Sequence, residues 1–167
     1  GARAGFARFR DEGAERVGMG VLLAKYERLH PSPALRASLE RYARFVREGL
    51  QTPDYVTYST AAHDSRNRAY NYMWVADLQF RMWELTGQQQ HALDGYGTLR
   101  AMFRQFGHNF YAIDIPVVLG LDVLQRAGLT AQRDTLLGDF RLQAASYLKN
   151  GSNYPKHEVN YEQSIVA

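Results

Sequence analysis

"AYNYMWVADLQFRMWELTGQQQHALDGYGTLRAMFRQFG" occupies residues 69–107 and decides the fold of the chain. Apolar side chains recur in it every three or four residues on both sides of Gly87. This period predicts two helices, at 69–87 and 89–107. Gly87 suits the left-handed residue that commonly follows a helix. The stretch therefore predicts an antiparallel helical hairpin, because only a few residues separate the two helices.

The same period continues along the rest of the chain. It predicts further helices at 15–30, 32–50, 114–128 and 130–151, with a seventh that starts near Tyr161. The expected N-caps are Ser32, Asp114 and Thr130, and Pro33 is expected at a first helical position. The apolar face of the first helix is expected to comprise Val17, Val21, Leu22, Ala24 and Leu29. Only residues 54–60 show an alternation of apolar and polar side chains, and this weak pattern suggests a short hairpin arm.

The helices pair into hairpins whose turns lie near His30, Gly87 and Gly128, roughly 40 to 57 residues apart. Helical hairpins that repeat at such a spacing predict a solenoid or a closed helical toroid. The expected fold class is therefore all-α, with residues 1–167 forming one domain of antiparallel helical hairpins.

Composition excludes several classes of function. The chain has 167 residues, no cysteine and a net charge of +3, so disulfides and thiolate chemistry are absent. Its Lys and Arg residues are scattered, which disfavours a nucleic-acid partner. No apolar run reaches the roughly 18 residues that a membrane-spanning helix needs. No metal or nucleotide motif occurs, so no metal and no cofactor are expected.

Polar and titratable residues gather in the connections between hairpins, at 58–72, 107–114 and 153–163. Stacked antiparallel hairpins place connections of one kind at one end, and loops on a rigid scaffold often carry function. These connections are therefore expected to share one rim. The candidate residues on it are His63, Asp64, Asn67, Asn71, Tyr72, His108, Asn109, Tyr111, Asp114, His157, Glu158, Asn160, Tyr161 and Glu162.

The candidates differ in how much chemistry supports them. A carboxylate neighbour can hold a histidine in a useful charge state, which favours His157 with Glu158. His108 comes next, with Asn109 and Tyr111 close by. Each of these residues also has an ordinary interpretation as a cap or turn former. Trp74, one turn into its helix, is the better placed of the two tryptophans to stack on a ring.

Repeated hairpins with segments such as "YNYMWVADLQFRMWELTGQQQHAL" (70–93) resemble the (α/α)6 toroids of carbohydrate-active enzymes, which include six-hairpin glycosidases and polysaccharide lyases. The resemblance implies that this chain forms about half of such a toroid and needs the remainder of a parent chain. It implies a sugar cleft at the rim and a polysaccharide or oligosaccharide substrate. Trp74 and the polar rim residues would bind this substrate. It would also place the parent protein outside the cell or in a periplasm.

Two mechanisms stay open under this resemblance. A hydrolase needs two carboxyl groups, for which the candidates are Asp64, Asp114, Glu158 and Glu162. A lyase that acts on a uronate needs a base and an acid together with groups that neutralise the carboxylate. The catalytic candidates are His157, Glu158, His108, Tyr111 and Tyr161, and the other rim residues are expected to bind substrate. The alternative class is a non-catalytic helical-repeat module that binds a protein or peptide.

Overall fold

The computed structural model describes residues 12–63, 68–109 and 114–150, and its helices confirm the all-α class. Within these residues the only β pairing is an isolated antiparallel bridge between Gln51 and Thr57. The helices are α1 (Glu12–Leu29), α2 (Pro33–Gly49), α3 (Ala69–Thr86), α4 (Gln89–Phe106), α5 (Val117–Arg126) and α6 (Thr130–Asn150). The arm expected at 54–60 is therefore one bridge and not a strand.

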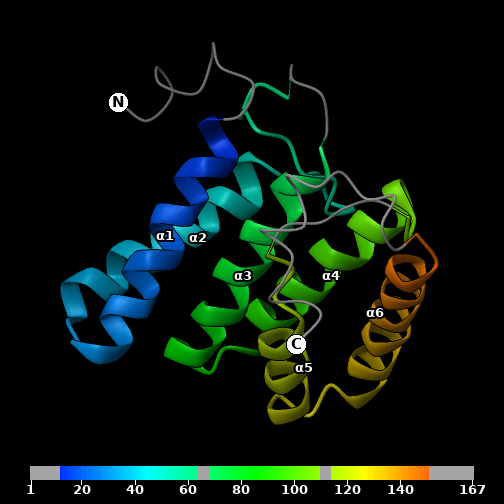
Figure 1. Ribbon diagram of the computed structural model, residues 1–167. Helices are drawn as coiled ribbons and strands as arrows, with labels where there is room; N and C mark the ends of the chain where they lie inside the picture. The colour runs from blue at the N-terminus through cyan, green and yellow to red at the C-terminus, as the bar shows by residue number, and fades with distance from the viewer. Residues whose placement is uncertain (1–11, 64–67, 110–113, 151–167) are drawn as a thin grey trace.

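Consecutive helices run antiparallel as three hairpins, α1–α2, α3–α4 and α5–α6 (Figure 1). Figure 1 shows the short turns at one end of the helices and the longer connections at the other. This is the arrangement that the sequence predicts for the connections, within the part of the chain that the structure describes. It is consistent with part of a helical toroid.

Local chemistry explains where α2 begins and where α3 ends. The backbone N–H of Leu35 donates to Ser32 Oγ at 3.3 Å, and Pro33 is the first helical residue, as predicted for this N-terminus. Gly87 follows α3 with φ of 69°, and its N–H donates to the Trp83 carbonyl at 2.8 Å. A residue with a Cβ is strained at that φ, so glycine fixes the end of α3.

Three predictions about the helices are wrong. Thr130 is the first residue of α6 and not its N-cap, because the Arg133 N–H donates to the Leu129 carbonyl. Asp114 does not cap α5, because the residue before a proline avoids helical geometry and α5 starts only after Pro116. Asp114 instead has φ of 57°. In α1, Leu22 and Leu29 are 57% and 75% exposed, whereas Val17, Val21 and Ala24 are buried as expected. The buried stripe of α1 is thus narrower than its apolar composition suggests.

Helix α3 is the centre of the fold because it contributes to two hydrophobic clusters. Val75, Leu78 and Met82 pack with α1 and α2, while Tyr72 and Phe80 pack with α4, α5 and α6. A helix that is covered on most sides must be apolar on most sides, which explains the sequence of α3. The polar residues that remain on it, between these two clusters, mark the hollows described next.

Candidate functional site

A groove of about 760 Å³ runs along α3 between α1 and the α5–α6 hairpin. Trp74, Asp77 and Arg81 line it from α3, and their spacing of three and seven residues places them on one face of the helix. Lys25 lines the groove from α1, and Asp114 lines it from the connection before α5. The groove therefore combines an aromatic ring with charges of both signs.

The charged side chains of the groove are linked to one another. Arg81 Nε lies 2.9 Å from Asp77 Oδ1, and Arg81 also approaches Glu84 at 3.6 Å. Burial raises the pKa of Asp77, while Arg81 and Lys25 oppose this rise. Arg28 of α1 donates to Glu84 at 2.9 Å. Lys25 and Arg81 line the groove, whereas Arg28 and Glu84 lie outside its lining.

The structure brings two of the predicted binding residues, Trp74 and Asp114, into this one groove. It places two others, Asn71 and Tyr72, beneath the surface, with exposures of 2% and 0%. Burial raises the pKa of Tyr72 to about 12, so its phenol stays neutral and is a poor base. Tyr72 packs edge-to-face on Phe106 with the ring centroids 5.8 Å apart. Its observed role is to join the start of α3 to the end of α4.

The two described rim histidines are held by different helices. His63 is exposed, stacks on Tyr58 at 4.5 Å, and its Nε2 lies 3.1 Å from the Gly49 carbonyl at the end of α2. His108 stacks on Phe103 at 4.9 Å, and its Nε2 lies 3.0 Å from Asp139 Oδ1 on α6. His63 and His108 therefore share an end of the fold, but each is anchored to its own neighbour.

Asp139 is also paired with Arg100 of α4, so its carboxylate joins α4, α6 and the connection that follows α4. Next to His108, Asn109 accepts a hydrogen bond from Ser146 Oγ at 3.0 Å. Asp139 and Ser146 are seven residues apart and share a face of α6. Arg141 lies on a different face, which lines the groove. His108 and Asn109 thus meet α6 away from its groove side.

The remaining predicted site residues lie outside the described residues. They are Asp64, Asn67, Tyr111, His157, Glu158, Asn160, Tyr161 and Glu162. The His157–Glu158 pair and the convergence of three histidines at one rim therefore stay predictions. Among the described residues no group of three or more His, Asp and Glu side chains could hold a metal ion.

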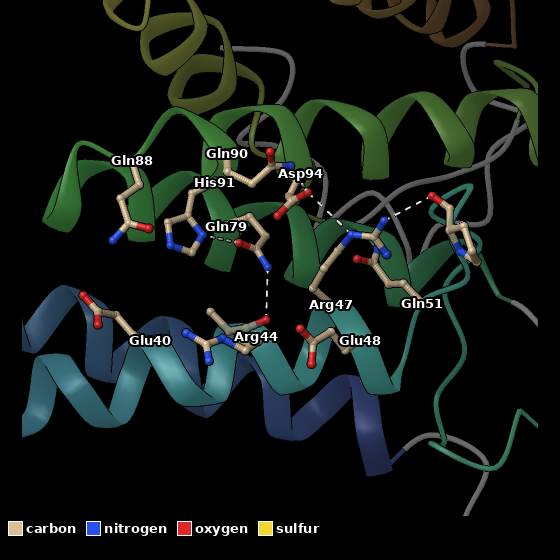
Figure 2. A pocket seen from close by; sticks show the side chains of 12 residues that line it. Glu40, Arg44, Arg47, Glu48, Gln51, Gln79, Gln88, Gln90, His91 and Asp94 are labelled. Carbon is tan, nitrogen blue, oxygen red and sulfur yellow. Dashed lines mark hydrogen bonds and ion pairs between the residues drawn. The ribbon is translucent and has the colours of Figure 1, made fainter.

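A second hollow, of about 610 Å³, lies between α2 and α4 (Figure 2). His91 and Asp94 of α4 face Arg44 and Arg47 of α2 across it, with Gln79 of α3 at its base. Sequence reasoning missed this cleft, because it looked for chemistry in the connections between hairpins and not within helices. The available signal was a histidine and an aspartate on α4 facing arginines on α2, which pattern alone does not pair.

None of the helices in the described part of the chain is both long and apolar enough to cross a membrane.

Comparisons with known proteins give an informative match among solved structures. No protein-family profile matches the chain, and no curated protein matches it. Among solved structures, a chain named as a polysaccharide lyase is 58% identical over 94% of this chain, with a TM-score of 0.86. The present chain spans about a quarter (24%) of that protein. The match supports a lyase-like chain at the level of sequence and fold.

One prediction concerns His91 in the cleft between α2 and α4. Burial lowers the pKa of His91, so below about pH 6.5 the unfolded chain takes up a proton that the folded chain does not. Stability should therefore fall as the pH drops below about 6.5, by up to about 1.4 kcal/mol per pH unit from this group. Urea unfolding of the wild type and of His91→Phe from pH 7.5 to 5 measures the effect as the difference between their slopes. Parallel pH curves for the two proteins would contradict it.

Proposed function

We propose that the protein to which this chain belongs cleaves an acidic polysaccharide by β-elimination. The observation that carries this proposal is the 58% identity to a protein named as a polysaccharide lyase. At that identity the residues of the groove and the rim are expected to serve a related chemistry. The lyase alternative is thereby favoured over hydrolysis, and an enzyme over a non-catalytic binding module.

The groove supplies groups that suit a uronate-containing chain. In β-elimination a base removes the proton next to the uronate carboxylate, and cations or hydrogen-bond donors stabilise the charge that develops. Lys25 and Arg81 are cations in the groove, and the Trp74 ring can stack on the apolar face of a sugar. We assign these three residues to substrate binding, with Asp114 at the groove edge.

For the base and the acid, the candidates remain His157, Glu158, His108, Tyr111 and Tyr161. Of these, only His108 lies in the described part of the chain. Its Nε2 faces the Asp139 carboxylate, on the side of α6 away from the groove, so His108 does not face a substrate that lies in the groove. His157 and Glu158 keep the support of their adjacency in sequence.

The decisive experiment incubates the intact polypeptide that carries this chain with polygalacturonate, alginate, hyaluronan and neutral glucans. Ultraviolet absorbance of the unsaturated uronate and the release of reducing ends are followed separately. Both signals rising on an acidic substrate supports the proposal. Reducing ends without the absorbance indicate a hydrolase. The absence of both signals indicates a binding module.

A second prediction tests the groove itself. Trp74→Ala is expected to raise KM about tenfold with little change in kcat, because a stacking contact contributes about 0.5–1.5 kcal/mol. Trp83→Ala is the matched control, since a spacing of nine residues puts Trp83 on the opposite face of α3, against Arg126. Trp83→Ala should lower stability and leave KM unchanged. An unchanged KM for Trp74→Ala would remove Trp74 from the site.

A further inference from the structure

We propose that the cleft between α2 and α4 is a second binding site, for a neutral, hydroxyl-rich ligand such as a short stretch of an uncharged sugar chain. The proposal does not depend on the reaction of the groove. It rests on the orientation of side chains in the cleft, on an orphaned acceptor in its floor and on the balance of charges around it.

The cleft and the groove lie on opposite sides of α3. Gln79 belongs to the cleft, whereas Asp77 and Arg81, two residues before and after it, belong to the groove. A two-residue step on an α-helix turns by about 200°. A ligand in the cleft is therefore separated from the groove by the body of α3 and does not compete for the same contacts.

The floor of the cleft holds an acceptor without a partner. Thr57 Oγ1 donates to the Tyr55 carbonyl at 3.0 Å, and Thr98 Oγ1 donates to the Asp94 carbonyl at 2.7 Å. Each hydroxyl has one hydrogen, so each can only accept from the Gln51 amide, whose Nε2 lies 2.9 Å from both. The orientation of the amide is thus fixed. Gln51 is 4% exposed, and its Oε1 has no hydrogen-bond partner.

An orphaned buried acceptor is costly, at about 1–3 kcal/mol. Gln51 lines the cleft, and its Nε2 is committed to the two threonines, so Oε1 faces the other way. Figure 2 shows the Gln51 amide beside the Arg47 guanidinium. A ligand that brings an O–H or N–H donor to this point would offset the cost, and this is the reason to expect a ligand here.

A second fixed acceptor comes from His91. Gln79 Nε2 donates to the Ala43 carbonyl at 3.3 Å, so Gln79 Oε1 is directed toward His91 Nδ1, 2.7 Å away (Figure 2). In the neutral ring Nδ1 therefore carries the proton and Nε2 carries the lone pair. The cleft thus offers two acceptors, from Gln51 and His91, whose polarity is set by their partners.

The charges around the cleft disfavour an anion. Its ionisable groups other than His91 are Glu40, Glu48, Asp94, Arg44 and Arg47, which sum to a net charge of −1. Arg47 is already engaged, since it donates to the carbonyls of Thr52 and Pro53 at 2.9 and 3.1 Å. Excess acceptors and carboxylates require a ligand that donates hydrogen bonds and carries no negative charge. Sugar hydroxyls meet both conditions, whereas a uronate does not.

The test titrates the intact polypeptide that carries this chain with cellohexaose, xylohexaose and mannohexaose, and with hexagalacturonate as the charged comparator. Backbone and side-chain amide resonances are followed by NMR, and affinity is measured by calorimetry. At least one neutral sugar should bind with a Kd of about 1 mM or tighter. It should shift the Gln51 side-chain amide and resonances in 40–51 and 88–94, while hexagalacturonate should not.

Variants make the test specific. His91→Phe keeps the ring and removes the acceptor, and Gln51→Met keeps the length and removes the amide. Each should weaken binding about tenfold or more, the loss of one good hydrogen bond. Arg133→Ala on α6 should bind as the wild type does. If Gln51→Met does not fold, His91→Phe alone still decides.

Two results would overturn the proposal. One is that none of the three neutral sugars shifts these resonances, which means that water alone satisfies Gln51. The other is that the shifts fall on groove residues such as Trp74. Neither result bears on β-elimination, which the product assay measures independently, so failure of this site and failure of the proposed reaction remain distinguishable.

Discussion

Replacing Arg36 with methionine is expected to lower the free energy of unfolding by about 3–5 kcal/mol. Glu27 of α1 is 1% exposed, and its carboxylate accepts two hydrogen bonds from Arg36 of α2, at 2.9 and 3.1 Å. Methionine retains most of the apolar stem of Arg36 but removes the guanidinium. A buried carboxylate would then have no counter-charge, and this desolvated charge is the source of the cost.

Urea unfolding at pH 7 measures this effect, and two further variants interpret it. Glu27→Gln combined with Arg36→Met should recover part of the loss, because no buried charge remains. Arg133→Met removes a pair with the exposed Asp134 at 2.7 Å and should change stability by no more than about 1 kcal/mol. If Arg36→Met costs no more than Arg133→Met, the pair does not hold α1 to α2.

The helical hairpins could be predicted because their information is local. Ser32 and Pro33 start α2, and Gly87 ends α3, through contacts with residues no more than four positions away. The face that a helix buries is not local information. Leu22 and Leu29 extend the apolar pattern of α1, yet they are exposed because neither α2 nor α3 covers them. The period of the sequence predicts a helix and the direction of its apolar face, but the packing partners decide how wide a stripe of that face is buried.

The candidate site was predictable only in part, for the same reason. Trp74 and Asp114, which were both expected to bind substrate, line a common groove. The groove cations Lys25 and Arg81 lie within helices, where a charge usually marks a solvated face. Their signal was Asp77 and Arg81 four residues apart in the otherwise apolar α3. A charge pair on a helix that is covered on most sides indicates a hollow beside it.

The cleft between α2 and α4 could not be predicted from sequence pattern because its partners are far apart along the chain. Gln51 reaches Thr98 over 47 positions, and His91 reaches Gln79 over 12. Glutamines and threonines form no recognisable spacing, and their meaning appears only when hydrogen-bond directions are followed. The two hollows share α3 as a wall, so α3 determines the position of both the groove and the cleft.

Replacing Gly95 with valine is expected to cost about 3 kcal/mol, at the upper end of what overpacking a core costs. A Cβ at Gly95 would lie 2.6 Å from the Phe80 ring, so the ring would have to move. The opposite edge of the ring already packs closely on Gly120, where even a Cβ would lie only 2.9 Å from it, so the ring has little room to move away. Phe80 is fully buried, so the whole contact between α3, α4 and α5 must adjust.

Gly138→Val is the matched control, since a Cβ at Gly138 on α6 meets nothing within 4 Å. It should be neutral within about 0.5 kcal/mol, because valine and glycine differ little in helix propensity. Phe80→Leu added to Gly95→Val should restore part of the loss by removing the ring that clashes. Thermal and urea unfolding of all four proteins measures this coupling. Equal stability of the two valine variants would show that α4 does not depend on the close approach at Gly95.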